Sequence, residues 1–128
     1  MDEIAFVVAE RELGIGPRVC AEPMINGEPL SDMLARVDGT PTGYAGLTPS
    51  DLAARLAPVS DREHVHVLGC IRGDDLCSWA RLSVTVESER ITWRDIQASH
   101  REAHAYAALG SFEFPRRQYE HALASLLG

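Results

Sequence analysis

The sequence predicts an α+β fold: an antiparallel β-meander sheet with two short helices in the first half of the chain and a C-terminal helix packed on the sheet. Three patterns carry this prediction. They are alternating apolar and polar residues in the middle of the chain, helix-capping signals in its first half, and one apolar stripe near the C-terminus. With 128 residues, 45% of them apolar, the chain can build one hydrophobic core. We therefore expect residues 1–128 to form a single domain.

Two apolar segments of strand length open the chain. The first runs from Ile4 to Ala9 and the second from Val19 to Ile25, with glycines and a proline between them at positions 14–17. Asn26-Gly27 is a favoured pair for a tight turn, because both residues adopt positive φ at little cost. This pair should close a turn immediately before the first helix.

Two short helices are expected next. Ser31 can cap the first, which should end at Asp38-Gly39. In the second, Thr48 stands at the N-cap and Asp51 three residues later, so that each side chain can satisfy a free backbone N–H group. With proline at the first helical position, these signals predict a helix from Pro49 to about Ala57.

The middle of the chain has the clearest strand pattern. Apolar and polar residues alternate from His64 to Cys70 and again from Ala80 to Glu87, with a predicted turn at Gly73-Asp74-Asp75. A third strand is expected from Ile91 to Ile96, so consecutive hairpins should form a meander. The segment Phe112 to Phe114 is expected to add a short edge strand.

The C-terminal segment predicts an amphipathic helix that begins after Pro115. One apolar stripe follows the i, i+3, i+4, i+7 spacing of a helix face, and it consists of Tyr119, Ala122, Leu123 and Leu126. This stripe should dock on the sheet.

Composition excludes several classes of function. The net charge of −7 argues against nucleic acid as a partner, because proteins that bind a phosphate backbone need a basic face. No apolar segment approaches the roughly 20 residues of a membrane span, so no membrane association is expected. The N-terminal residues lack the pattern of a secretion signal, and we expect a cytoplasmic protein. All 12 basic residues are arginines, which we attribute mainly to codon usage.

Four segments that span most of the chain form a recognisable set of motifs. They read I-N-G-E-P-L at 25–30, Y-A-G-L-T-P at 44–49, L-G-C-I-R-G at 68–73, and L-G-S-F-E-F at 109–114 followed by Arg117, Tyr119, Ala122 and Leu123. Together they resemble the I-N-G-x-x-L, Y-A-G-L-x-P, L-G-C-x-C-G and L-G-P-F-x-F-x-R-x-x-Y patterns of an uncharacterised family of small proteins common in actinobacteria. The resemblance supports the fold and implies no particular activity.

The chain departs from these patterns at three positions. Arg72 stands where many relatives carry the middle cysteine, Ser78 where they carry tryptophan, and Ser111 where they carry proline. Because the middle cysteine is missing, a metal or redox role for a cysteine trio is not expected here.

Three cysteines remain, an odd number in a chain large enough to fold without disulfides. Cys70 and Cys77 are separated by six residues, so a tight hairpin could place them on adjacent strands. Cytosolic cysteines are most often buried and inert, and we expect these two and Cys20 to be reduced. Asp74-Asp75 could chelate a cation, but we assign the pair to the turn.

Histidine is the one notable concentration of chemically versatile residues. His64 and His66 lie two apart on a predicted strand and so share a face, whereas His100 and His104 would share a face if their segment were helical. Four imidazoles could then converge. The alternative is that these histidines lie at the surface or at strand ends without a joint role.

A convergent histidine group would support hydrolytic chemistry. Three imidazoles and a water molecule suit zinc, and Glu63 or Glu102 could then act as the base. No recognised metal-binding or catalytic signature accompanies the histidines. We therefore expect no metal and no cofactor, and keep a small histidine-based enzyme as an alternative.

Trp79 and Arg81 are the best candidates for a binding surface. They lie two apart on a predicted strand, and tryptophan beside arginine is typical of interface hot spots. The alternative is that a helix simply buries the tryptophan ring. The sequence thus favours a non-catalytic module that binds a protein or a small molecule. An immunity-type inhibitor or a self-associating protein, such as a homodimer, is a further alternative.

Overall fold

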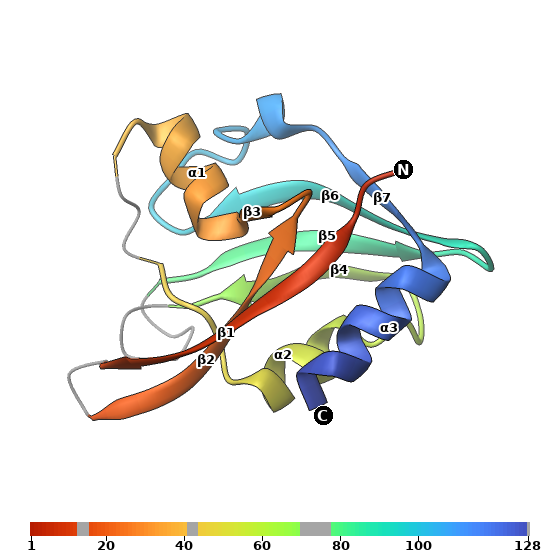
Figure 1. Cartoon of the computed structure of the whole chain (residues 1–128). Helices are drawn as coiled ribbons and strands as arrows, with labels where there is room; N and C mark the ends of the chain where they lie inside the picture. Colours follow the sequence, from red (N-terminus) through yellow and green to blue (C-terminus); the bar gives the residue numbers. More distant parts are fainter. Residues whose placement is uncertain (13–15, 41–43, 70–77, 128) are drawn as a thin grey trace.

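The computed structural model describes residues 1–12, 16–40, 44–69 and 78–127. These residues form two antiparallel sheets with three α-helices, so the predicted α+β class is confirmed. Figure 1 shows the three-stranded sheet in front of the four-stranded one, with α1 on one side of the front hairpin and α2 and α3 on the other. The elements in chain order are β1 (Ile4–Glu12), β2 (Pro17–Ile25), β3 (Glu28–Pro29), α1 (Leu30–Asp38), α2 (Pro49–Leu56), β4 (Arg62–Leu68), β5 (Ala80–Val86), β6 (Arg90–Ala98), the 3₁₀ turn η1 (Ala107–Leu109), β7 (Phe112–Pro115) and α3 (Arg116–Leu127).

The first sheet is a long hairpin with a two-residue third strand. β1 pairs with β2 from Ile4 opposite Ile25 to Glu12 opposite Pro17. The predicted turn follows, with positive φ at Asn26 (52°) and Gly27 (84°), and it leads into β3 and then α1. The sequence predicted these strands, but it did not predict that they form a sheet separate from the meander.

The first helix begins differently from the prediction. Pro29 occupies the N-cap of α1, so the prediction that Ser31 caps this helix is wrong. The buried carboxylate of Glu22 on β2 instead accepts hydrogen bonds from the Ser31 backbone N–H (3.0 Å) and hydroxyl (2.7 Å). A negative group at a helix N-terminus is favourable both to the free N–H groups and to the helix dipole. Gly39 ends α1 in the left-handed conformation (φ 78°), as predicted.

The second helix has the predicted boundaries but not the predicted cap. Thr48 is the N-cap and Pro49 the first helical residue, yet the Thr48 side chain makes no capping hydrogen bond. The reciprocal Thr48–Asp51 arrangement is therefore wrong. Asp51 pairs with Arg55 one helical turn later, with 3.1 Å between Oδ1 and Nε.

The second sheet is the predicted meander, in the order β4-β5-β6-β7. Its first strand is less regular than expected, because the β4–β5 register shifts between Arg62 and Val65 and again between His66 and Leu68. The predicted alternation therefore fails at the end of β4, where Val67 and Leu68 are both buried. The turn predicted at Gly73-Asp74-Asp75 lies outside the described residues.

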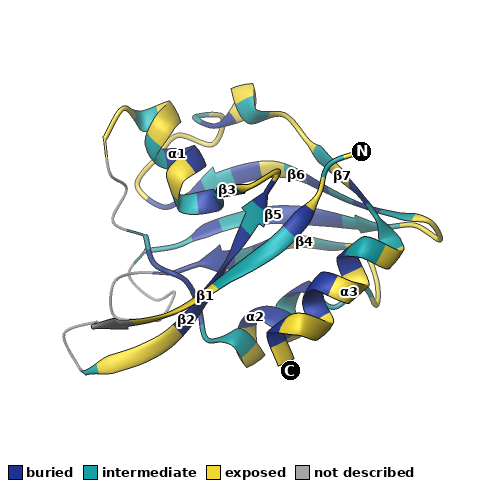
Figure 2. Ribbon diagram, viewed as in Figure 1, coloured by how far each residue is buried: buried dark blue, intermediate teal, exposed yellow. Residues whose placement is uncertain are grey.

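One hydrophobic cluster joins both sheets and all three helices. The predicted stripe of α3 is buried in it, and Figure 2 shows the buried side of this helix turned toward the sheets. The rings of Trp93, Phe114 and Tyr119 form its aromatic centre, with the Trp93 ring edge-on to the other two at 5.1 and 5.9 Å. The Tyr119 hydroxyl donates to the Leu56 carbonyl (2.8 Å) and so ties α3 to α2.

A short extended segment, residues 44–47, connects the two sheets and is called the strap below. Its Leu47 pairs with Ala21 of β2, and its Ala45 pairs with Gly69 at the end of β4. Gly46, between them, is buried against the backbone of Ala21. The strap is thus hydrogen-bonded to the first sheet through Leu47 and to the residue that follows β4 through Ala45.

Candidate functional site

The candidate site lies on the outer face of the four-stranded sheet, the face turned away from the hydrophobic core. His66, Arg81 and Gln97 stand directly opposite one another on β4, β5 and β6. Directly opposed residues of antiparallel strands point to the same side of the sheet. Their chain neighbours Val65, Leu82 and Ala98 are buried in the core, so the three polar side chains belong to the outer face.

Trp79 lies just before β5 and contacts two of these side chains. The His66 ring stacks on it with 5.0 Å between centroids and 17° between planes. The guanidinium carbon of Arg81 lies 4.4 Å from the centre of the indole ring, within the range of a cation–π interaction. We call His66, Trp79 and Arg81 the Trp79 stack. All three residues are half-buried, so the indole ring is not covered completely.

Hydrogen bonds to β6 and the segment after it hold this stack in place. The Trp79 backbone N–H donates to Ser99 Oγ (2.9 Å), and the Ser99 N–H donates to the Trp79 carbonyl (2.9 Å). Arg81 Nε donates to Gln97 Oε1 (3.1 Å). These bonds fix the Trp79 backbone and the Arg81 guanidinium, while the indole is held by its contacts with His66 and Arg81, and this order lowers the entropy lost when a partner binds.

A hollow of about 540 Å³ adjoins the stack at the edge of β4. We call it the β4 hollow. It shares His66 with the Trp79 stack, and its lining consists of Arg55, Arg62, Glu63, His64, Val65 and His66. Arg55 is already paired with Asp51, so the lining offers one guanidinium without a carboxylate partner among the described residues, that of Arg62, and one carboxylate, that of Glu63.

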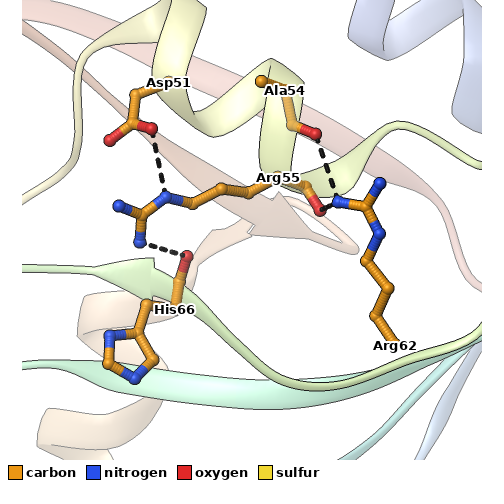
Figure 3. Close-up of polar contacts among 5 residues, drawn as sticks. All are labelled: Asp51, Ala54, Arg55, Arg62 and His66. Atoms are coloured by element: carbon orange, nitrogen blue, oxygen red, sulfur yellow. Dashed lines mark hydrogen bonds and ion pairs between the residues drawn. The ribbon is translucent and has the colours of Figure 1, made fainter.

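Figure 3 shows how two arginines join α2 to β4 beside this hollow. Arg55, on α2, donates from Nη1 to the His66 carbonyl (3.5 Å). Arg62, at the start of β4, donates from Nη1 to the carbonyls of Arg55 (3.1 Å) and Ala54 (3.4 Å). These carbonyls lie in the last turn of α2, where no helical N–H is available, so the cation satisfies them and offsets the negative end of the helix dipole.

Arg62 and Arg81 differ from the other half-buried arginines of the described residues in their ion pairing. Most arginines of the described residues pair with an aspartate or glutamate. Within the described part of the chain, Arg62 and Arg81 are the two half-buried arginines for which no carboxylate partner is found. A half-buried cation without a counter-ion is costly. Arg81 stands directly opposite His66 on the outer face, whereas Arg62 stands opposite the buried Val84 and donates to carbonyls of α2.

The predicted histidine pairs do not meet at one point. His64 and His66 both line the β4 hollow, where His64 is exposed and has a positive φ of 58° at the irregularity of β4. His100 is an exposed turn residue with φ 64°, and the segment from it to His104 is a series of turns rather than a helix. The helical condition under which His100 and His104 would share a face is therefore not met.

His104 has its own acidic neighbour. It lies 3.5 Å from Glu102, in an exposed pair beside a smaller hollow of about 270 Å³ along β6.

Over residues 1–12, 16–40, 44–69 and 78–127, no three histidine, cysteine, aspartate or glutamate side chains gather closely enough to hold a metal ion. Of the predicted cysteines, Cys20 is buried, and Cys70 and Cys77 lie outside the described residues.

A partly buried polar cluster that the sequence did not suggest fixes the end of α1. The Tyr106 hydroxyl donates to Asp38 Oδ2 (2.8 Å), and Arg101 Nε lies 3.5 Å from Oδ1 of the same carboxylate. Burial, reinforced by the Asp38 carboxylate, raises the pKa of Tyr106. The phenol therefore stays protonated and acts as a structural donor.

Comparison with protein families, with curated proteins and with solved structures finds no match to this chain. None of the helices in the described ranges is both long enough and apolar enough to cross a membrane.

Proposed function

We propose that this protein is a non-catalytic binding module that recognises a protein partner through the Trp79 stack on the outer face of β4–β6. The observation that carries the proposal is the half-buried indole of Trp79, held between β4 and β6 outside the core and contacted by Arg81 at 4.4 Å. Tryptophan and arginine are the residue types most enriched among interface hot spots.

The surroundings of the stack favour a protein partner over a small molecule. The outer face is a row of side chains on paired strands, His66, Arg81 and Gln97, and not an enclosed cavity. Small ligands usually bind in concave sites that bury most of their surface, whereas protein partners bind comparatively flat surfaces around a few anchors. A pre-positioned indole beside a guanidinium suits the second case.

The experiment compares capture of partners by the parent protein and by Trp79→Ala. Each is immobilised and incubated with native lysate, retained proteins are identified by mass spectrometry, and binding of each is then measured with the purified partner. We expect Trp79→Ala to lose the partner, while its melting temperature stays within a few degrees of the parent because the ring lies outside the core. Val59→Ala, at an exposed apolar residue away from the stack, is the control and should retain it.

Capture that is unchanged by Trp79→Ala would remove the stack as the partner surface. Sedimentation of the purified protein over a range of concentrations adds a second check. If Trp79→Ala abolishes a parental dimer, the partner is a second copy of this chain. If the parent is monomeric and Trp79→Ala loses a heterologous partner, the proposal stands as stated.

A further inference from the structure

We infer that Arg81 is the anion-recognition point of this surface and that the partner presents an acidic segment whose carboxylate binds the Arg81 guanidinium. The inference rests on the proposed function, because it names the chemistry of the partner that the Trp79 stack binds. It goes beyond that function by assigning one side chain a defined role.

The hydrogen-bond pattern of Arg81 leaves its outer edge open. Nε donates to Gln97 Oε1 at 3.1 Å, and this bond sets the plane of the guanidinium. Within the described residues, Nη1 and Nη2 have no acceptor and the side chain has no carboxylate partner. These two nitrogen atoms form the end-on fork of an arginine, which matches the two oxygen atoms of a carboxylate.

The indole of Trp79 prepares this fork for binding. It lies 4.4 Å from the guanidinium carbon and shields the cation from water without satisfying its N–H donors. A partly desolvated and immobilised cation binds an anion more strongly than a mobile, fully hydrated one. The neighbouring Arg94 provides a contrast on the same face. It stands opposite Ser83, two residues from Arg81, but its Nη1 already pairs with Asp95 at 2.6 Å.

Arg62, the other half-buried arginine without a carboxylate partner in the described residues, does not extend this site. It stands opposite the buried Val84 and donates to two carbonyls of α2, so it lies on the inner side of the sheet, whereas Arg81 lies on the outer face. The carboxylate of the partner is therefore assigned to Arg81 alone. The overall charge of −7 does not prevent this, because at physiological salt charges more than about 8 Å away are largely screened.

The test uses a blocked peptide of four glutamates and a matched peptide of four glutamines as probes. Each is titrated into the full-length protein, and the side-chain N–H signals of Trp79 and Arg81 are followed by NMR. We expect saturable shifts with the glutamate peptide and none with the glutamine peptide. Arg81→Gln should weaken binding about tenfold or more, since a charge-assisted pair is lost. Arg94→Gln, the matched control, should change the affinity about twofold or less.

Several outcomes would overturn the inference. One is the absence of saturable shifts with the glutamate peptide, and another is equal weakening by Arg81→Gln and Arg94→Gln. An Arg81→Lys variant that binds as tightly as the parent would show that charge alone suffices and that the fork has no role. If Trp79→Ala loses the captured partner while the glutamate peptide does not bind, only the acidic chemistry is wrong and the partner surface stands. Unchanged capture by Trp79→Ala would instead remove the proposed function itself.

Discussion

The strap makes a strong prediction about Gly46, because replacement by alanine should destabilise the protein although the backbone conformation permits it. Gly46 does not have positive φ, so alanine carries no conformational penalty there. In open space such a substitution stabilises a protein by about 0.4–1 kcal/mol, since it restricts the unfolded chain. Whether Gly46→Ala stabilises or destabilises the protein therefore depends only on the room for the added methyl group.

The structure leaves no room for the added methyl group. A Cβ at Gly46 would lie 2.7 Å from the Ala21 carbonyl carbon and 3.0 Å from its nitrogen, and closer still to its oxygen, whereas ordinary contact begins at 3.4 Å. These are backbone atoms, so no rotamer change can relieve the clash. The strap must move away from β2, which weakens the Ala21 N–H to Leu47 carbonyl bond (2.6 Å) and its reciprocal bond (3.0 Å). Overpacking of about 1–3 kcal/mol and two hydrogen bonds of about 1 kcal/mol each give a loss of about 3–5 kcal/mol.

Urea unfolding followed by circular dichroism measures this loss as a shift of the midpoint at constant slope. Gly27→Ala is the control. It faces open space but has φ 84°, so it should cost only about 1–2 kcal/mol from left-handed strain. A Gly46→Ala variant as stable as the parent would refute the reasoning, because it would show that the strap does not pack against β2 as described.

Two further predictions concern the core around α3. Leu123→Ala should cost about 2–5 kcal/mol, because Leu123 is buried in the stripe of α3. His121→Ala, at an exposed position of the same helix, should change stability by about 0.5 kcal/mol or less. Equal denaturation midpoints for the two variants would show that α3 is not docked. Tyr119→Phe should cost about 1–3 kcal/mol, because it leaves the Leu56 carbonyl without its donor. Circular dichroism in urea checks both predictions, and a Tyr119→Phe variant as stable as the parent would contradict the assignment of this hydrogen bond.

The elements of this fold were predictable where the signal is local. The structure confirms three features that local sequence patterns predict: the stripe of α3, the Asn26-Gly27 turn and the β-meander. The N-cap of α1 was not, because its acceptor is Glu22 on a neighbouring strand, which no local pattern identifies. The division of the strands into two sheets could not be predicted from the sequence for the same reason. Periodicity shows that one face of a strand is buried, but it does not show which strand lies beside it.

The candidate site shows the same division. Trp79 and Arg81 were expected on one face from their spacing, and they are in contact. His66 joins them only through the β4–β5 register, which two irregularities of β4 set and which the sequence does not reveal. Arg62 was not singled out at all, since its position at the start of a strand is unremarkable. That it has no carboxylate partner among the described residues is a property of the tertiary structure.

The bond from Arg55 to the His66 carbonyl has a consequence for behaviour at high concentration. β4 is an edge strand, and exposed edge strands invite pairing with strands of other molecules, which leads to aggregation. Here a charged side chain occupies a carbonyl at that edge, and the left-handed residue His64 interrupts the regular spacing of the N–H and C=O groups beside it. Edge-to-edge pairing along β4 is thereby disfavoured, so this end of the sheet can present side chains to a partner with little risk of templating a fibril.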